Sequence, residues 1–166
     1  AAVPYGIWRA DQRYKEWNLT NGQASLISQA PGLGLFNTLG ALSLYYGDDW
    51  PYSENGARIN TILMYSGSSI APFLAKKYIS GKSYTEDDAY FIGISMGVGF
   101  VNSLLLVDIL ELDNIRPNWL LMLGGVNGFT YLGDKINQGK NLKRGDGRII
   151  GLGISASWLV WLGVAT

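Results

Sequence analysis

Two residue types that carry much of protein chemistry are missing from this chain of 166 residues: it has no cysteine and no histidine. Without cysteine there are no disulfides or thiolate nucleophiles, and without either residue the usual zinc ligands are absent. Ser-His-Asp triads and imidazole general bases are excluded as well. No carboxylate pair or activated nucleophile stands out, so we predict that the protein is not an enzyme and has no catalytic, cofactor-binding or metal-binding residues.

Charge is scarce and balanced. Only 16% of the residues are charged, and 13 lysines and arginines match 13 aspartates and glutamates. With no net charge and no basic stripe, a nucleic-acid partner is not expected. What the chain has instead is 22 glycines, 13% aromatic residues and a hydrophobic share of 48%.

The letters "SGKS" at residues 80–83 match the end of a phosphate-binding loop. That motif needs a glycine five residues before its Gly-Lys, in a loop that follows a β-strand. The position is Lys76 here, and residues 68–79 are typical of a helix end. A shift of 58 positions aligns "KKYISGKSYTEDDAYFIG" (76–93) with "DKINQGKNLKRGDGRIIG" (134–151). The recurring feature is a turn with its flanks, and we predict that no nucleotide binds.

Charged residues divide the chain into long uncharged segments. These occupy residues 17–47, 59–75, 89–107, 117–133 and 149–166. Four of them have 17 to 19 residues, near the roughly 20 that a membrane-spanning helix needs. The first is longer, and we expect Pro31 to kink it or to mark its start.

Helix-boundary signals lie where this division predicts. The pairs Thr20/Gln23 and Thr85/Asp88 have the spacing of a capping box. Other signals are a serine N-cap, a proline for the first helical position and two glycines for helix ends: Ser53, Pro117, Gly81 and Gly139. We predict an all-α domain at residues 19–166 with five main helices, two helix pairs and a final single helix, in repeats 19–83, 84–141 and 142–166. Residues 1–18 form an aromatic and charged N-terminal arm.

Small residues recur four positions apart within the segments. This spacing places them on one helix face, where helix backbones can approach closely. Because glycine in a soluble helix costs about 1 kcal/mol relative to alanine, close packing must offset that cost. At Gly97 and Gly99 we expect a helix contact, where Gly97→Leu should cost several kcal/mol. The predicted helix-contact or oligomer-interface residues are Gly67, Ala71, Gly93, Gly97, Gly99, Gly124, Gly128, Gly151, Gly153, Ser155, Trp158 and Trp161.

A β-strand interpretation competes with the helical one. Large residues alternate with small ones over residues 92–100 and 150–158, as in the strands of a small outer-membrane β-barrel. However, the lumen-facing half of such strands should carry charges, and residues 103–112 do not alternate. We favour helices and keep the barrel as the alternative.

The capped helix starts and four-residue glycine spacing of residues 19–166 resemble glycine-zipper helical repeats of bacterial envelope and surface proteins. Two positions depart from the pattern: Asp87 replaces a glycine in the second copy, and Lys143 replaces the capping threonine in the third. The resemblance implies an envelope location and a packing role, and it implies no catalytic residue.

Two environments fit the uncharged segments. Lysines and arginines number three, one, three, one, five and none in successive connectors from the N-terminal arm onward, an alternation that the positive-inside rule gives for five spans with the N-terminus inside. The alternative is a helical assembly whose apolar faces meet protein. The start "AAVP" would suit an exported protein after signal-peptide cleavage, and the N-terminus would then lie outside, opposite to the charge rule. It would equally suit a piece of a longer chain.

We therefore expect a structural or assembly subunit of the cell envelope, membrane-embedded or joined into a helical oligomer through small-residue faces. The expected partners are further copies of the chain or other envelope subunits, together with lipid. The final helix, with Trp158 and Trp161, has no second helix to cover it, which favours an oligomer. The alternative is an oligomeric membrane channel or transport component, although no ionisable residue lies mid-span.

Overall fold

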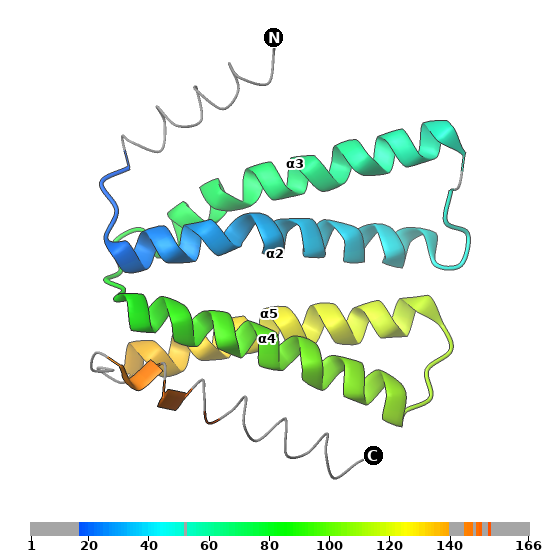
Figure 1. The fold of residues 1–166 in the computed structure, drawn as a ribbon. Coiled ribbons are helices and arrows are strands. Elements are labelled where there is room, and N and C mark those ends of the chain that lie inside the picture. Colours follow the sequence, from blue (N-terminus) through cyan, green and yellow to red (C-terminus); the bar gives the residue numbers. More distant parts are fainter. Residues whose placement is uncertain (1–16, 52, 140–144, 148, 151–152, 154–166) are drawn as a thin grey trace.

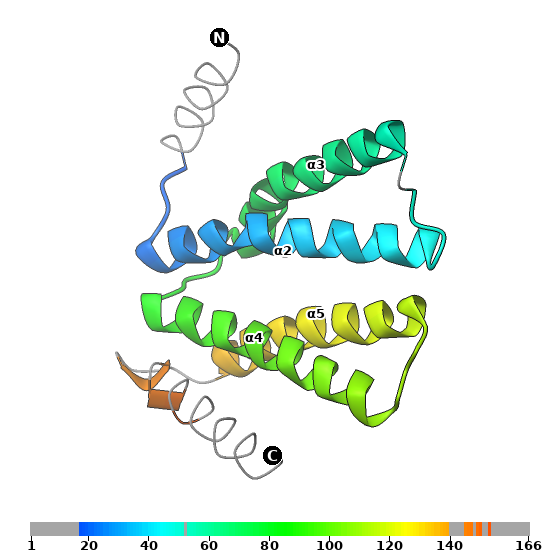
Figure 2. The same cartoon turned by 45° about the vertical axis from the view of Figure 1, so that its right-hand side comes forward.

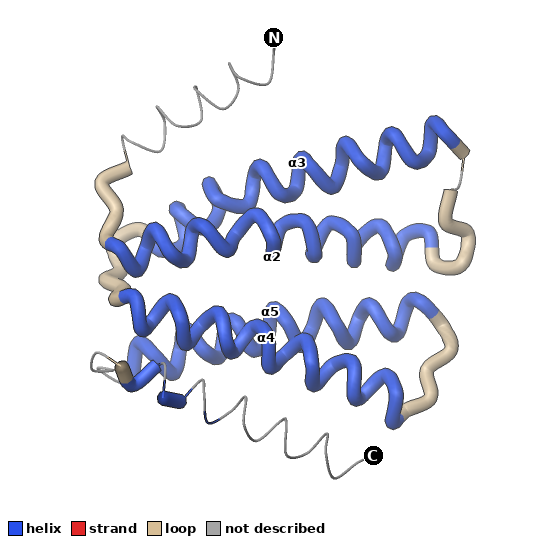
Figure 3. Tube along the Cα trace, viewed as in Figure 1, coloured by secondary structure: helices blue, strands red, loops and turns tan. Residues whose placement is uncertain are grey.

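The computed structural model describes residues 17–51, 53–139, 145–147, 149, 150 and 153. It has four long helices, α2 (Asn21–Tyr46), α3 (Glu54–Ile79), α4 (Glu86–Ile109) and α5 (Ile115–Gly139). No strand occurs in this part of the chain (Figure 3). The all-α prediction is confirmed and the β-barrel alternative is wrong. The N-terminal arm, apart from its last two residues, and most of the expected fifth helix lie outside the described residues.

The predicted helix starts are observed at α2 and α4. The Gln23 amide donates to the Thr20 hydroxyl (3.2 Å), and the Thr20 amide donates to Gln23 Oε1 (3.0 Å). At α4 the Asp88 amide donates to the Thr85 hydroxyl (3.2 Å), and the Thr85 amide donates to the Asp88 carboxylate (2.6 Å). Both capping boxes are therefore confirmed.

Other boundary expectations have mixed outcomes. Ser53 caps α3 as expected, because its hydroxyl accepts the Gly56 amide. Gly81 follows α3 with a left-handed φ of 76°. In contrast, Pro31 lies inside α2 and does not mark its start, and Pro117 is the third residue of α5 because that helix begins at Ile115.

The helices form two hairpins, α2–α3 and α4–α5 (Figures 1 and 2). Among the described helices α3 packs against α2 alone, whereas α2 also packs against α4 and α5. Residues 47–53 and 110–114 connect the helices at one end of the bundle, which we call the loop end. The 80–85 segment joins the hairpins at the other end, the connector end (Figure 1).

Each hairpin is held by a crossing of small residues, and the two crossings are built alike. In α2–α3 a Cβ on Gly34 would lie 2.5 Å from the Ala71 Cβ and from the Gly67 carbonyl oxygen. In α4–α5 a Cβ on Gly99 would lie 2.8 Å from the Phe129 Cβ and closer still to the Gly125 carbonyl oxygen. The backbones therefore meet almost directly at both crossings.

A hydroxyl side chain lies next to each crossing. Thr38 donates to the Gly34 carbonyl (2.9 Å) and Ser103 to the Gly99 carbonyl (2.8 Å), so each bonds back to the glycine four residues earlier. Shifts of 65 residues relate α2 to α4 at these positions, and a shift of 58 relates Gly67 to Gly125. The two hairpins thus repeat one packing solution.

The alternation over residues 92–100 has a helical explanation. Two small residues of α4, Ser95 and Gly99, contact α5, since a Cβ on Gly133 would lie 2.6 Å from the Ser95 hydroxyl oxygen. Gly93 instead contacts α2, where a Cβ would lie 2.7 Å from Gln29 Oε1. Two helix neighbours in different directions therefore produce a pattern that imitates a strand.

Candidate functional site

A buried carboxylate, Asp134 of α5, lies at the connector end and is 3% exposed. The Tyr78 and Tyr84 hydroxyls each donate to it at 2.6 Å, one to each carboxylate oxygen. The Gln138 amide (2.7 Å) and the Lys82 ammonium (3.3 Å) also donate to Oδ2. We call these five residues the Asp134 cluster. It joins the end of α3, the connector and the end of α5.

The surroundings of Asp134 shift its pKa in both directions. Burial raises the pKa of the carboxyl, but hydrogen bonds from Tyr78, Tyr84 and Gln138 and the charge of Lys82 together lower it below its ordinary value. Asp134 is therefore ionised at neutral pH. Its oxygens already accept four donors, so it is a structural acceptor with little capacity left to act as a base.

The two tyrosines respond in the opposite way. Burial, with the hydrogen bond to Asp134, raises the pKa of Tyr78 to about 12. The same two causes raise the pKa of Tyr84 further above its ordinary value. Both hydroxyls stay protonated and donate to the carboxylate over the whole physiological range.

The "SGKS" segment lies in the connector and is used structurally. The Lys82 amide donates to the Ile79 carbonyl (3.0 Å), which closes the expected turn around Gly81. The Lys82 carbonyl accepts the Gln23 side-chain amide (2.8 Å), and its ammonium lies 3.7 Å from the centre of the Tyr78 ring. Lys82 thus ties the turn to α2 and to Asp134.

A groove with a volume of about 570 Å³ leads away from the Asp134 cluster between α3 and α5, and residues of α2 together with Ile92 and Met96 of α4 also line it. Its lining is mostly apolar, and we call it the α3–α5 groove. Residues that line it include Leu33, Ile70, Leu74, Tyr78, Tyr131 and Asp134. A groove of this size, apolar along its length and polar at one end, has the form of a site for a small amphiphilic molecule.

Asp87, which departs from the repeat pattern, has a visible role. Its side chain is 5% exposed, and the carboxylate accepts the Gly145 amide at 2.7 Å. The start of α4 is thereby joined to residues 145–147. A glycine at position 87 would lack this acceptor.

The predicted contact residues fall into three groups. Gly67, Ala71 and Gly99 lie at the two crossings, and Gly93 faces Gln29. Gly151, Ser155, Trp158 and Trp161 lie outside the described residues. For the third group, Gly97, Gly124, Gly128 and Gly153, a Cβ would have no atom of the described residues within 4 Å.

No atom of the described residues lies within 4 Å of a Cβ at Gly97, Gly124 or Gly128, so a contact role for these three positions stays a prediction. On α5 the four-residue spacing selected a different glycine from the one at the crossing. Gly124 and Gly125 are adjacent, and the four-residue spacing to Gly128 selects the first of them, but the helix turns the second toward Gly99.

Several residues of the site were missed by the sequence analysis. Asp134 is separated in the sequence by 56 residues from Tyr78 and by 50 residues from Tyr84. The only local signal was the i, i+4 spacing of Asp134 and Gln138, which is common on any helix. The shift of 65 that relates the capping boxes would have identified Gly34, because it aligns with Gly99.

The chain has no match among the known proteins to which it was compared. No protein-family model matches it, and comparisons with curated proteins and with solved structures find no significant similarity.

Proposed function

We propose that this protein is an integral membrane subunit with a structural or assembly role in a cell envelope, and that its helices lie side by side across the bilayer. The observation that carries the proposal is a belt of exposed apolar side chains without charge. On α3 the uncharged segment spans residues 59–75, and large exposed side chains on it include Ile62, Tyr65 and Ile70. Water would be a poor solvent for such a surface.

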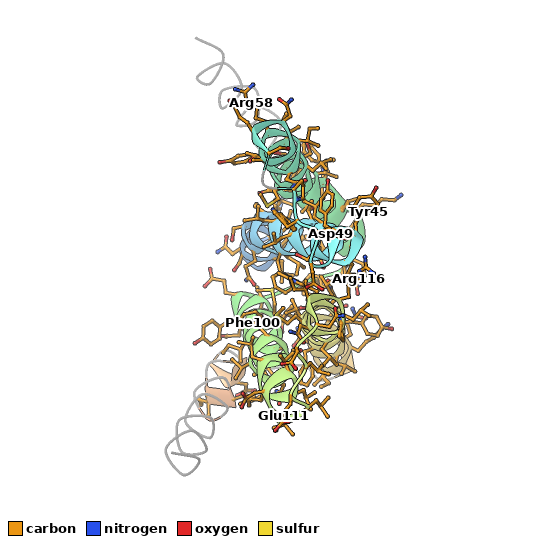
Figure 4. The ribbon with its side chains drawn as sticks, turned by 90° about the vertical axis from the view of Figure 1, so that its right-hand side faces the viewer. Tyr45, Asp49, Arg58, Phe100, Glu111 and Arg116 are labelled. Atoms are coloured by element: carbon orange, nitrogen blue, oxygen red, sulfur yellow. The ribbon has the colours of Figure 1, made fainter. Side chains whose placement is uncertain are left out.

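The size of the belt fits a bilayer. Segments of 17 to 19 residues rise about 26–29 Å at 1.5 Å per residue, close to the roughly 30 Å of the hydrocarbon core. Charged groups lie beyond it at both ends. Seen end-on in Figure 4, Arg58, Asp49, Arg116 and Glu111 lie around the loop end, and the Asp134 cluster lies at the connector end.

By length and hydropathy, α4 is the one described helix that could cross a membrane unaided. Only 28% of its apolar stretch is buried, whereas the core helix of a soluble protein is mostly buried. The other helices carry amides and hydroxyls that lower their hydropathy. Some of these groups are satisfied internally, as where Asn37 and Asn127 donate to each other at 3.1 and 2.6 Å.

The distribution of basic residues favours one orientation. Among the described residues, two basic side chains lie near the loop end, Arg58 and Arg116, and four lie near the connector end, Lys76, Lys77, Lys82 and Lys135. We propose that the connector end faces the cytoplasm.

The absence of cysteine permits a direct test of location by single-cysteine labelling. We expect Ile62→Cys, in the belt, to resist a membrane-impermeant maleimide in intact host membranes and to react once detergent is added. Asp49→Cys should react without detergent in intact cells, where only the outer side meets the reagent, and Ser83→Cys should react without detergent only in inverted membrane vesicles. Equal labelling of all three variants in intact membranes would contradict the proposal, and unmodified protein serves as the blank.

We also propose that copies of the chain associate through the open glycine positions of α5, where a second helix can approach closely. The purified protein in mild detergent should have a protein mass that corresponds to two or more chains of 18.2 kDa each. Gly124→Leu combined with Gly128→Leu should shift it toward the monomer, whereas Gly32→Leu on α2, also without near neighbours, should not. A wild-type monomer at every protein concentration would refute the association.

A further inference from the structure

The α3–α5 groove has two walls whose backbones stand apart. Both α3 and α5 pack against α2, but no Cα atom of α3 lies within 8 Å of a Cα atom of α5 among the described residues. At the connector end the Tyr78–Asp134 hydrogen bond links the two walls. The result is a groove that is closed at one end and open along its side.

Along its length the groove offers apolar contact and little else. Ile70 and Leu74 of α3 remain 53% and 62% exposed, so they have unused apolar surface. The amides of Asn37 and Asn127 also line the groove, but they hydrogen-bond to each other and require no polar group from an occupant. This part of the groove suits a hydrocarbon chain.

The closed end selects the polar part of an occupant. The Lys82 ammonium and the Asp134 carboxylate lie 3.3 Å apart and balance each other, so neither a cation nor an anion finds an unpaired opposite charge. An anionic head group would lie near the buried Asp134 carboxylate, which is unfavourable. The Tyr78 hydroxyl donates a hydrogen bond to Asp134, and its oxygen lone pairs can still accept one from an occupant.

We propose that the α3–α5 groove binds an uncharged single-chain amphiphile with a hydroxyl head group, of the monoacylglycerol class. The chain lies between α3 and α5, and a head-group hydroxyl donates to Tyr78. The head group of the ligand then lies beside the charged connector end of the protein, and its hydrocarbon chain lies beside the apolar belt. The binding rests on the groove alone and does not depend on the membrane location proposed above.

The experiment uses the full-length protein in a short-chain detergent, a fluorescent monoacylglycerol as the reporter and three unlabelled competitors. We expect 1-monooleoylglycerol to displace the reporter saturably, and oleate and oleylamine to compete at least tenfold more weakly. Equal competition by all three molecules, or no saturable binding, would overturn the proposal. Because no bilayer is used, this result is independent of the cysteine-labelling test.

Paired variants of α3 locate the site. Ile70→Trp fills the groove and should weaken reporter binding at least tenfold, whereas Ile62→Trp, on the same helix and outside the groove lining, should leave it unchanged. Leu74→Trp is the second groove variant, and circular dichroism shows that each variant is folded. Tyr78→Phe should weaken the binding of 1-monooleoylglycerol and leave the binding of oleylamine unchanged. If Ile62→Trp weakens binding as much as the groove variants, the reporter is adsorbed on the exposed belt and the site does not exist.

Discussion

Replacing Gly99 by alanine is expected to destabilise the protein by about 1–3 kcal/mol or more. The matched replacement Gly97→Ala, two positions earlier on the same helix, should instead stabilise it by up to about 1 kcal/mol. A Cβ on Gly99 meets the Gly125 backbone and the Phe129 Cβ, and neither can move without separating α4 from α5. A Cβ on Gly97 meets no atom of the described residues within 4 Å, so alanine adds only its higher helix propensity. The measurement is the midpoint of denaturant unfolding in mixed micelles, followed by circular dichroism.

The first hairpin provides an independent repeat of the same comparison. Gly34→Ala should destabilise, because its Cβ would press on Ala71 and Gly67, and Gly32→Ala should not. Equal losses at Gly97 and Gly99 would mean that another surface covers Gly97, such as a second copy of the chain. Equal gains at both would mean that the α4–α5 crossing is looser than described.

The elements that the sequence predicted well are those that depend on neighbouring residues. A capping box is complete within four positions, so Thr20/Gln23 and Thr85/Asp88 could be recognised without knowing the fold. The lengths of the uncharged segments likewise indicated long helices. Pro31 was harder to place, because proline is accepted within a helix when its surroundings compensate for the missing hydrogen bond.

The contact faces were only partly predictable. Four-residue spacing shows that two small residues share a face, but it does not show which face meets another helix. On α4, both Gly93/Gly97 and Ser95/Gly99 satisfy the spacing, and only the second pair faces α5 at both positions. The Asp134 cluster could not be predicted, since three of its four donors come from α3 and the connector, far from Asp134 in the chain, and the fourth, Gln138, offers only a common i, i+4 spacing.

The second large effect is expected at that cluster. Asp134→Asn should lower the free energy of unfolding by about 3 kcal/mol, because it removes a buried charge whose partners stay in place. The asparagine NH₂ would also face groups that are themselves donors. Tyr84→Phe should cost about 1–2 kcal/mol, and Tyr78→Phe less, because Tyr78 is 50% exposed. Asp108→Asn, at an exposed position near the end of α4, is the control and should change stability by no more than about 0.5 kcal/mol.

The pH dependence of stability separates an electrostatic role of Asp134 from simple packing. Because the pKa of Asp134 is lower in the folded state than its ordinary value, its contribution is present above about pH 4 and is lost as the pH falls through the folded-state pKa. The pKa of Tyr78 is raised to about 12, so its contribution is present below about pH 10 and is lost as the pH rises from there through its folded-state pKa. The wild type should therefore lose stability at both extremes, and Asp134→Asn should lose less at the acid end.

Tyrosine ionisation gives a readout that packing alone does not change. In the wild type, ultraviolet absorbance should show a subset of tyrosines that ionise well above the ordinary pKa, because burial and the Asp134 carboxylate both disfavour tyrosinate. Asp134→Asn removes the carboxylate and leaves most of the burial, so these tyrosines should ionise at lower pH while the others are unaffected. If the variant is destabilised but its tyrosine titration matches that of the wild type, Asp134 acts by filling space, and the hydrogen-bonded carboxylate is not what joins α3 to α5.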